Sequence, residues 1–326
     1  MNAQIKTMKT KEIEQLLGIK MLYTIEDKDI SPLDWANENK EEVKSFVERN
    51  GVLLLRGFKT IEENDFGSIL SLLFGGELID YAYRSTPRTE LKNKVYTATE
   101  YHHSEWIPQH NEKAYSNKWP SRIGLVCKIK ADKMGNTPIS DSRIAYNEIP
   151  AEIREEFEQK DVMYVRNYSD IDLPWQEVFQ TDKKEQVEAY CKANNIRTEW
   201  TPNGLRTKQI NKASLIHPVT KDKLWFNQAH LFHVSNLDDE LKEGLIAVLG
   251  EENLPRNTYY GDGTPIDPEV LDVIREVYKK TKVSFDWQEN DLLLLDNMLY
   301  THGREPFEGT RKVLVGMALE YSPSLN

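Results

Sequence analysis

The stretch from residue 291 to residue 317, "DLLLLDNMLYTHGREPFEGTRKVLVGM", contains two apolar segments separated by a polar break. The first segment is a run of four leucines, residues 292–295, which has the length of a buried strand and ends at the pair Asp296-Asn297. His302 follows, before a glycine-containing loop, and the second apolar segment is a strand that starts at Arg311. The pattern predicts two buried strands at the C-terminal end of a β-rich core.

Arg311 is unusual because it opens an apolar strand. Counted from Arg311 with the two-residue period of a strand, Val313, Val315 and Met317 lie on the same face. The guanidinium would then point where the apolar side chains point, and a buried guanidinium requires a carboxylate or an equivalent partner. Either an internal glutamate or a bound small acid would meet this requirement.

The rest of the chain alternates short strand patterns with helical ones. Residues 41–50 form an amphipathic helical pattern that runs into an apolar strand at 52–55, with Gly51 as the stop signal. Further helices are predicted at 151–160, 183–194, 237–250 and 267–280. We find no internal repeat and no low-complexity linker, so residues 1–326 are predicted to form a single β-rich domain, with helical and lid insertions at about 150–280.

Composition excludes several classes of function. The chain has 326 residues, a formal net charge of −11 and no basic cluster, so nucleic acid is not an expected partner. No apolar run is long enough to span a bilayer, and the N-terminus lacks a signal-peptide core, which predicts no membrane association. With only two cysteines, Cys127 and Cys191, a reducing cytoplasm is the expected location. The sequence gives no oligomeric state.

Two His-x-Glu pairs occur in the chain, His103 with Glu105 and His110 with Glu112. With 7 histidines and 53 acidic residues in 326, roughly one such pair is expected by chance. On a strand, both side chains of a pair would point to the same face. Spacing alone does not separate a metal-binding pair from a polar surface strand, and an isolated His302 is more often a structural histidine.

A resemblance becomes specific when these features are taken together. A His-x-Glu pair, then "GNTPISDSR" (135–143), then "DNMLYTHGREPFEGTRKVLVGM" (296–317) is similar in order to the iron(II)/2-oxoglutarate-dependent dioxygenases of the taurine dioxygenase and clavaminate synthase-like family. Within this family the chain looks most like the branch associated with nonribosomal peptides, such as the syringomycin-type aspartate hydroxylases. The match runs from "NGVLLLRGF" (50–58) to "GMALEYS" (316–322).

The resemblance implies a fold and a metal site. The expected fold is mainly β with surrounding helices, a double-stranded β-helix (jelly roll) core with helical insertions. The metal pair of the family lies just upstream of the strand that precedes Gly-x-Thr, which selects His110 and Glu112, with His302 as the third ligand. Two imidazoles and one carboxylate leave three positions on Fe(II) open for a 2-oxo acid and O2.

The resemblance also implies the residues that hold 2-oxoglutarate. Its distal carboxylate would bind Arg311, with the hydroxyl of Thr137 beside it. Arg304 is a second candidate near the cosubstrate, although an ion pair with Glu305 or Glu308 would explain it equally well.

The implied reaction couples the decarboxylation of 2-oxoglutarate to the hydroxylation of an aliphatic C–H bond. In the related halogenases a small residue replaces the metal-binding carboxylate, so Glu112 favours hydroxylation over chlorination. Desaturation or cyclisation would remain open on the same iron site. The expected substrate is a small molecule of the amino-acid type, free or presented by a carrier protein, in antibiotic or related natural-product biosynthesis.

Substrate-binding residues are less well marked. Arg206, Asn227 and Arg143 are candidates, each with a structural role as the alternative. The neighbours of Asn227, namely Gln228, His230 and His233, are polar groups in an aromatic stretch that resembles a segment near the active site of the family. The segments 76–101 and 99–106 have the polar, irregular composition of a lid over the site.

Three other functions remain as alternatives at this point. One is a catabolic dioxygenase of a small sulfonate or a related acid, because substrate class transfers poorly between proteins of one fold. A non-enzymatic jelly-roll binding protein would need no ordered set of histidines, carboxylate and arginine. A zinc hydrolase would use the same metal ligands but would have no need of Arg311.

Overall fold

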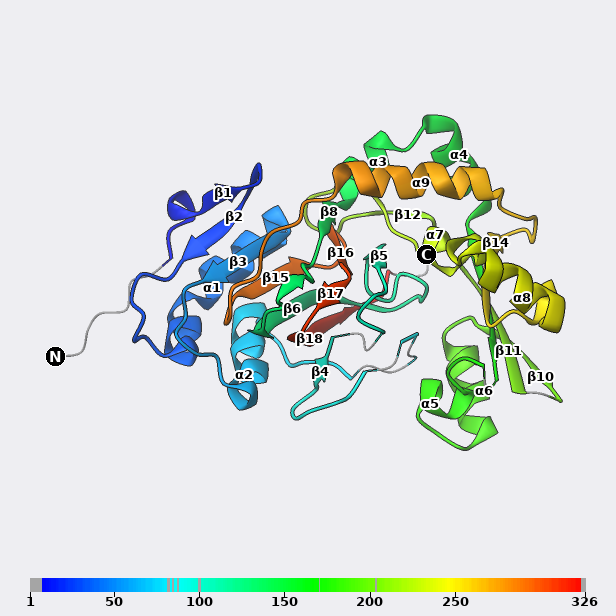
Figure 1. The fold of residues 1–326 in the computed structure, drawn as a ribbon, viewed down its shortest axis with the longest axis horizontal. Helices are drawn as coiled ribbons and strands as arrows, with labels where there is room; N and C mark the ends of the chain where they lie inside the picture. The colour runs from blue at the N-terminus through cyan, green and yellow to red at the C-terminus, as the bar shows by residue number, and fades with distance from the viewer. Residues whose placement is uncertain are drawn as a thin grey trace.

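The computed structural model describes residues 8–80, 83, 85–86, 88–98, 101–169, 171–202 and 204–323. Its largest element is a seven-stranded sheet, which lies at the left and centre of Figure 1. Only β2 and β3 pair in parallel; all other neighbours in the sheet are antiparallel. In spatial order the strands are β1 (Glu14–Leu16), β2 (Ile19–Thr24), β3 (Val52–Arg56), β15 (Leu292–Asp296), β6 (Trp119–Ile129), β18 (Lys312–Tyr321) and β4 (Val95–Thr97).

The leucine run that opens the C-terminal stretch forms β15, between β3 and β6. All four leucines are fully buried, because both faces of the sheet are covered. Leu292 and Leu294 face the cluster made with helices α1 (Pro32–Asn50) and α2 (Glu63–Phe74), whereas Leu293 and Leu295 face the opposite cluster. An unbroken run of apolar residues, without alternating polar ones, thus corresponds to a strand that is buried on both faces.

Helix α1 begins earlier than the sequence pattern indicated. It starts at Pro32, and the Ser31 hydroxyl accepts a hydrogen bond from the Asp34 amide at 3.4 Å. Serine as N-cap followed by proline in the first turn is a common start signal, but it lies nine residues before the predicted start. Gly51 ends the helix in the left-handed region, at φ 89°, as predicted.

A three-stranded sheet faces the second side of the large sheet. It consists of β5 (Ile107–His110), β16 (Tyr300–Arg304) and β8 (Ile139–Asp141), in the order β5-β16-β8. Ile139 and Tyr300 from these strands belong to the same hydrophobic cluster as Leu293, Leu295 and Val315 of the large sheet. Two facing sheets with this apolar layer between them form the jelly-roll core that the sequence predicted.

Residues 151–281 build the part at the right of Figure 1. Its four-stranded sheet has the order β10-β11-β9-β14, and a third hydrophobic cluster packs this sheet against its helices. The four helices predicted for this region are present with ends shifted by at most two residues. The elements of this part are α4 (Ala151–Lys160), β9 (Val162–Tyr168), α5 (Trp175–Phe179), α6 (Lys184–Ala193), β10 (Arg197–Thr201), β11 (Gly204–Asn211), β12 (Ser214–Ile216), β13 (Lys223–Trp225), α7 (Ala229–Phe232), α8 (Asp239–Leu249), β14 (Arg256–Tyr260) and α9 (Pro268–Thr281).

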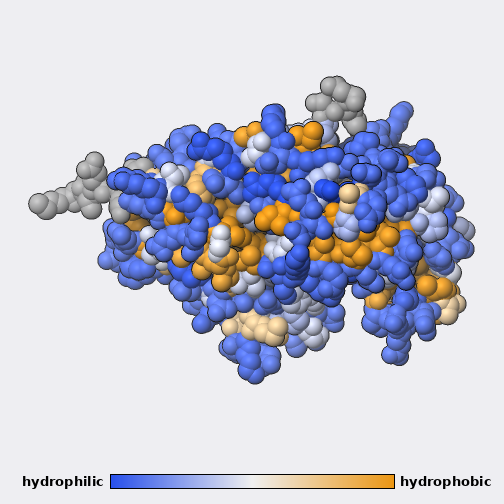
Figure 2. Space-filling model, turned by 90° about the horizontal axis from the view of Figure 1, so that it is seen from above, coloured by the Kyte–Doolittle hydropathy of each residue, from blue (hydrophilic) through white to orange (hydrophobic). Residues whose placement is uncertain are grey.

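Short elements complete the described chain: the helix α3 (Ser142–Glu148) and the two-stranded pair of β17 (Phe307–Glu308) with β7 (Lys133–Met134). On the face seen in Figure 2, apolar side chains gather in a band through the middle, bordered on both sides by hydrophilic residues. Among the described residues, we find no helix that combines the length and the apolar character needed to cross a bilayer.

Two glycines let helix α2 approach the large sheet closely. Gly124 of β6 and Gly316 of β18 are paired across the sheet, and a Cβ added to Gly124 would lie 2.2 Å from Leu70 Cδ2 and 3.1 Å from its Cγ. Leu70 is fully buried and has little room to move. Because both glycines lack a side chain, Leu70 of α2 packs directly against the backbone of β6 and β18.

We expect Gly124→Ala to lower the free energy of unfolding by about 1–3 kcal/mol, the usual cost of overpacking a core. The matched control is Gly244→Ala in helix α8, where an added Cβ meets nothing within 4 Å. There the change should be neutral or stabilise by about 0.5–1 kcal/mol, because alanine is the better helix former. Urea denaturation of both variants measures the difference. Equal stability of the two variants would contradict this account of the packing.

Candidate active site

The pairing of β5 with β16 brings together the residues of a candidate metal site. In this antiparallel pair His302 lies directly opposite His110, and the two ring centroids are 4.7 Å apart. The Nε2 atoms of His110 and His302 lie 4.0 and 3.8 Å from Oε2 of Glu112. Their ligand atoms all fall within 4.8 Å of one another, in a region that is buried. Segments 192 residues apart in sequence thus converge on one point.

Glu112 does not lie on the strand, in contrast to the expectation for a His-x-Glu pair. β5 ends at His110, and Glu112 belongs to the following turn. The side chain of Asn297 holds this turn: its Oδ1 accepts the Glu112 amide at 2.7 Å, and its Nδ2 donates to the Glu112 carbonyl at 2.9 Å. Main-chain contacts from a distant asparagine, rather than strand geometry, place the carboxylate beside the imidazoles.

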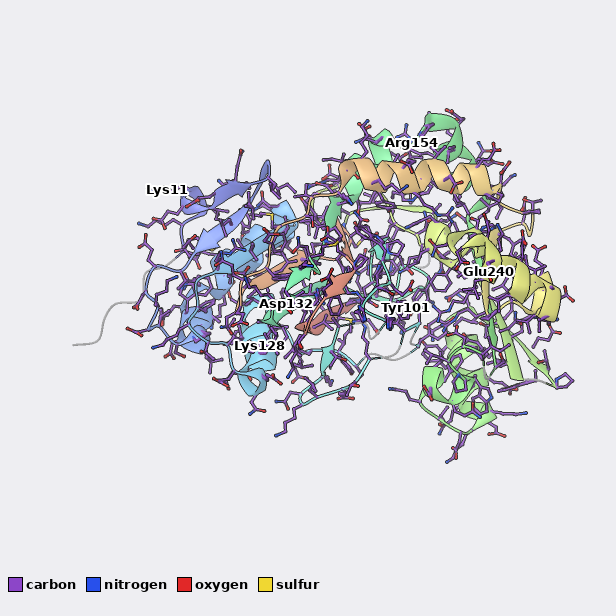
Figure 3. All side chains as sticks on the ribbon, in the orientation of Figure 1. Lys11, Tyr101, Lys128, Asp132, Arg154 and Glu240 are labelled. Carbon is purple, nitrogen blue, oxygen red and sulfur yellow. The ribbon has the colours of Figure 1, made fainter. Side chains whose placement is uncertain are left out.

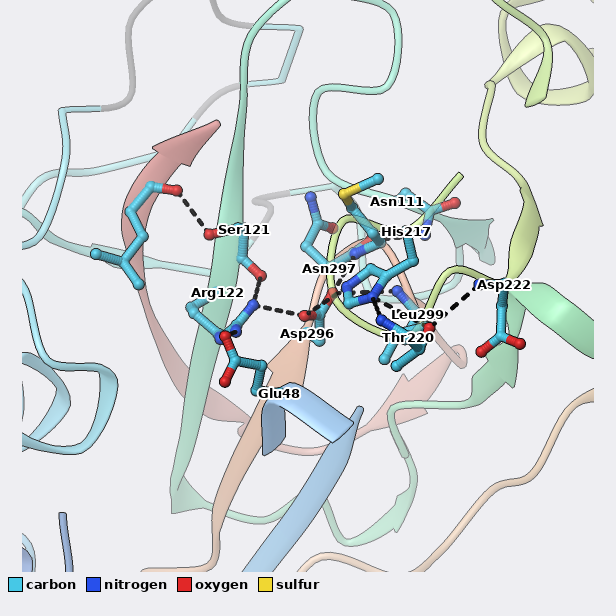
Figure 4. A network of polar contacts seen from close by, with 12 residues as sticks. Glu48, Asn111, Ser121, Arg122, His217, Thr220, Asp222, Asp296, Asn297 and Leu299 are labelled. Atoms are coloured by element: carbon cyan, nitrogen blue, oxygen red, sulfur yellow. Dashed lines mark hydrogen bonds and ion pairs between the residues drawn. The ribbon is translucent and has the colours of Figure 1, made fainter. Parts of the chain in front are cut away.

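A network of polar contacts behind the site holds Asp296, the residue before Asn297 (Figure 4). Asp296 accepts an ion pair from Arg122 at 2.5 Å and a contact from His217 Nε2 at 3.2 Å, while its other oxygen accepts the amides of Met298 and Leu299. The Asp-Asn pair that ends the leucine strand is therefore a rigid corner. It carries the chain from β15 into β16, the strand of His302.

The protonation states of the three ligands suit a cation. Burial lowers the pKa of His302 to about 3, with His110 adding to the effect, and burial also lowers the pKa of His110. Burial alone would raise the pKa of Glu112, but the charge of the Arg88 guanidinium, the largest of the opposing effects, brings it down to about 2. Neutral imidazoles and an ionised carboxylate are the forms that bind metals.

Hydrogen bonding also orients His110 for a metal. Its Nδ1 lies 2.8 Å from the carbonyl oxygen of Pro108, so Nδ1 carries the proton and Nε2 presents a lone pair to the cluster. Two nitrogen ligands and one carboxylate oxygen on one side of a cavity fit a first-row transition metal such as Fe(II).

The cavity in front of the cluster holds the predicted cosubstrate residues. Arg311 donates from Nε to the Gly135 carbonyl at 2.7 Å and from Nη2 to the Thr137 hydroxyl at 3.3 Å, and Trp287 Nε1 donates to the same hydroxyl at 3.1 Å. Burial and repulsion from Arg304 lower the pKa of Arg311 to about 10. No carboxylate among the described residues pairs with Arg311. Besides Arg311 and Thr137, the cavity is lined by Arg88, Arg304, His110, His302 and Gly303 and by an apolar wall of Ala98, Ile107, Leu125 and Val315.

Arg304 lines the cavity, and its guanidinium also makes contacts that the sequence did not predict. Its guanidinium donates to the carbonyls of Tyr101, His102 and Glu105, at 2.9, 2.6 and 2.9 Å. Arg304 thus fastens the base of the segment that was predicted to be a lid, and Figure 3 shows Tyr101 near the centre of the molecule. Glu308 pairs with Lys133, and Glu305 accepts from Ser284. Residues 81, 82, 84, 87, 99 and 100 of the predicted lid lie outside the described residues.

The predicted substrate residues do not line this cavity. Arg206 donates to Asn167 and Asn253, and Arg143 forms a salt bridge with Asp141. Asn227 caps the local backbone through Ala213 and Ala229. Their assignment to the substrate stays a prediction, and these contacts favour the structural alternative for each.

Gln228 and His230 hydrogen-bond the main chain of the two residues that flank His110. Gln228 Nε2 donates to the Asn111 carbonyl at 2.6 Å, and His230 Nε2 lies 3.1 Å from the Gln109 carbonyl oxygen. Since burial lowers the pKa of His230 to about 3, the ring is neutral and Nε2 donates. His233 Nδ1 lies 2.8 Å from the Ser235 hydroxyl, in its own turn.

Sequence reasoning missed Arg88. Its Nη2 lies 2.7 Å from Glu112 Oε2, and both side chains are almost fully buried, with relative exposures of 3% and 4%. Arg88 belongs to the irregular segment after Gly76, where nothing in the local pattern distinguishes one arginine from a surface charge. Only the folded structure reveals the contact.

We expect Glu112→Gln to weaken Mn(II) or Co(II) binding by on the order of a hundredfold, because the site loses its only charged ligand. Calorimetric titration under anaerobic conditions measures the affinity. Glu105→Gln is the control, since Glu105 belongs to the rival His-x-Glu pair and is exposed. A greater loss in Glu105→Gln than in Glu112→Gln would show that the wrong pair has been assigned.

The lowered histidine pKa values predict a metal affinity that changes little between pH 7.5 and pH 5.5. Histidines of ordinary pKa, about 6.5, would each reduce affinity by about tenfold for every pH unit below that value. Here the folded protein already holds the imidazoles neutral. Titrations of Mn(II) at a series of pH values check the expectation. A steep loss of affinity just below pH 6.5 would contradict it.

Comparison with known proteins agrees with this geometry. The family model described as "Taurine catabolism dioxygenase TauD, TfdA family" matches residues 15–318. The dapdiamide synthesis protein DdaC of Enterobacter agglomerans is 42% identical over 284 residues, which are 86% of this chain and 86% of that protein.

Two solved structures share the fold. The PvcB protein from Pseudomonas aeruginosa has a TM-score of 0.52 and 16% identity, and covers 91% of this chain and 84% of its own. An asparagine oxygenase in complex with Fe(II), 2S,3S-3-hydroxyasparagine and succinate has a TM-score of 0.53 and 13% identity, and covers 90% of this chain and 87% of its own. With the family model matching most of its length, the chain belongs to the TauD/TfdA family and is an iron(II)- and 2-oxoglutarate-dependent dioxygenase.

Proposed function

We propose that this enzyme hydroxylates an aliphatic carbon of an amino acid or an amino-acid derivative, free or carrier-tethered, in natural-product biosynthesis. The observation that carries the proposal is the buried cluster of His110, Glu112 and His302, which lines one cavity with Arg311, a guanidinium that pairs with no carboxylate in the described part of the chain. The chain is also 42% identical to a dapdiamide synthesis protein. The matched relative belongs to the biosynthesis of a small molecule, which favours this substrate class over a sulfonate.

In this proposal the three ligands bind Fe(II), which together with 2-oxoglutarate and O2 supplies the oxidising power for the reaction. The chain itself keeps both imidazoles neutral and the carboxylate ionised, and it holds that carboxylate by its main chain through Asn297. Since Glu112 provides a third protein ligand, we infer hydroxylation rather than halogenation.

Arg311 and Thr137 are proposed to bind the distal carboxylate of 2-oxoglutarate. The guanidinium is anchored on one side by the Gly135 carbonyl, and Trp287 fixes the Thr137 hydroxyl. This arrangement fixes the orientation of a guanidinium that lines the same cavity as the two histidines. The apolar wall of Ile107, Leu125 and Val315 would exclude water from the reaction.

We also infer that the enzyme works in the reducing cytoplasm. Cys127 and Cys191 are both buried and free, and burial raises the pKa of each thiol to about 12. Such thiols persist where disulfides are not formed.

Anaerobic addition of Fe(II) and 2-oxoglutarate should produce a weak visible charge-transfer band. We expect Arg311→Met to raise the 2-oxoglutarate concentration needed for half of this band by on the order of a hundredfold, because the cosubstrate loses a charge-assisted contact. Metal affinity without 2-oxoglutarate should stay unchanged. An unchanged 2-oxoglutarate titration would contradict the assignment of Arg311.

The substrate is tested by a screen of free and carrier-loaded amino acids, with succinate release and a gain of one oxygen in product mass as readouts. Turnover of amino acids with this mass gain is the expected result. Turnover limited to sulfonates or to other acids without an amino group would refute the proposed substrate class.

A further inference from the structure

We propose that Trp287 is a positioning residue for the cosubstrate: its indole N–H makes the Thr137 hydroxyl a hydrogen-bond donor to the distal carboxylate of 2-oxoglutarate. Trp287 thereby contributes to the selection of 2-oxo acids that carry a second carboxylate. The inference rests on the proposed function, which assigns Arg311 and Thr137 to that carboxylate, and it adds a residue that the sequence did not mark.

The first argument is the hydrogen-bonding capacity of the Thr137 hydroxyl. A threonine hydroxyl has one proton to donate and two lone pairs that accept. Trp287 Nε1 lies 3.1 Å and Arg311 Nη2 lies 3.3 Å from Thr137 Oγ1. Since an indole N–H and a guanidinium can only donate, these two contacts occupy both lone pairs. The hydroxyl proton is left to be donated, and in the described part of the chain no acceptor takes it.

The second argument is what Thr137 and Arg311 together offer to a ligand. Both residues line the cavity that is also lined by the two metal-binding histidines. Within the described part of the chain Arg311 uses Nε and Nη2 for hydrogen bonds, which leaves the N–H groups of Nη1 for a ligand. The hydroxyl and the guanidinium therefore present only donors. The matching ligand group accepts hydrogen bonds and donates none, which describes an ionised carboxylate.

The third argument is that Trp287 itself is firmly placed. The residue is 5% exposed and is not among the described residues that line the cavity, so it acts on a ligand through Thr137. Its ring packs edge-on against Phe285, with ring centroids 5.1 Å apart. The residue before it, Asp286, accepts a hydrogen bond from Asn136 Nδ2 at 3.1 Å, which ties the segment of Trp287 to the segment of Thr137.

The main chain on both sides of Trp287 is also fastened, by one ion pair. Arg56 pairs with the fully buried Asp291 at 2.6 Å. Arg56 donates to the Asp286 carbonyl at 2.9 Å, and Asp291 accepts the Gln288 amide at 2.8 Å. The indole N–H is therefore oriented before a cosubstrate arrives. Binding then requires less ordering of the site, which favours affinity.

A purely structural explanation would be that Trp287 only satisfies its own buried N–H. Two other indoles show that the chain does not require this. Trp119 and Trp225 are also buried, and their Nε1 atoms contact no hydrogen-bond acceptor among the described residues. Trp119 belongs to the same hydrophobic cluster as Trp287. The bond from Trp287 to Thr137 is therefore better explained by its effect on the hydroxyl.

The test is a double-mutant cycle, in which anaerobic calorimetry measures the affinity of the Mn(II)-loaded protein for 2-oxoglutarate. Trp287→Phe keeps an aromatic ring but removes the N–H, and it should weaken binding by about fivefold, the usual effect of one hydrogen bond. Thr137→Val should weaken binding by about tenfold or more, because it removes a hydrogen bond to a charged group. In the Thr137→Val background, Trp287→Phe should cause no further loss beyond about twofold.

Two comparisons separate this role from packing. The acid 2-oxopentanoate has the same carbon chain but lacks the second carboxylate, and it should bind to Trp287→Phe as to wild type, as measured by the charge-transfer band with Fe(II). Trp119→Phe is the matched control for the loss of a buried indole, and it should bind 2-oxoglutarate as wild type does. If Trp287→Phe does not fold, replacement of Trp287 by 3-benzothienylalanine, which has the shape of tryptophan without the N–H, carries the same expectations.

The outcomes distinguish this inference from the proposed function. Wild-type affinity for 2-oxoglutarate in Trp287→Phe would overturn the role of Trp287. So would a loss of equal size in the Thr137→Val background, with 2-oxopentanoate, or in Trp119→Phe. If Arg311→Met still weakens 2-oxoglutarate binding, these results leave the proposed cosubstrate site intact; if Arg311→Met has no effect either, that site is wrong as well. Failure of the amino-acid screen alone refutes the proposed substrate and leaves the role of Trp287 untouched.

Discussion

The active site depends on one strand pairing, that of β16 with β5. The antiparallel pairing places His302 directly opposite His110, with ring centroids 4.7 Å apart, although the two residues are far apart in the sequence. Two other features hold β16 in place. β8 pairs with its other edge, and the corner at Asp296-Asn297 fixes where β16 begins. A slip of one residue would turn His302 to the opposite face and dismantle the metal site.

The corner at Asp296-Asn297 both stabilises the buried core and positions Glu112. The carboxylate of Asp296 is fully buried and accepts hydrogen bonds from Arg122, His217 and two backbone amides. The side-chain amide of Asn297 hydrogen-bonds the main chain of Glu112 and Pro120. A buried network of this kind is costly when incomplete and rigid when complete. Asn297 follows Asp296 directly and hydrogen-bonds the main chain of Glu112. The rigid network therefore also fixes the turn of Glu112, although this carboxylate does not lie on a strand.

The core could be predicted from the sequence because it leaves a local signal, and the order of motifs pointed to three candidate metal ligands that the structure brings together. The leucine run of β15 and the apolar alternation after Arg311 mark strands, and the helices at 151–160 and 267–280 have clear periodicity. His110, Glu112 and His302 followed from the order of motifs in a resembling family. The contacts of Arg304 and the position of Arg88 could not be predicted, because an arginine in an irregular segment acquires its meaning only from distant partners. The same holds for the Ser31 start of α1, whose first turns carry little apolar periodicity.

The support that residues 151–281 give to the metal strand has a consequence for engineering. Gln228 and His230 bond to the carbonyls of Asn111 and Gln109, on either side of His110. The region that differs in form from the jelly-roll core therefore cannot be swapped between homologues as an independent cassette to change specificity. A chimera that omits these two side chains would remove the donors to two carbonyls beside His110, and we expect it to disturb the candidate metal site.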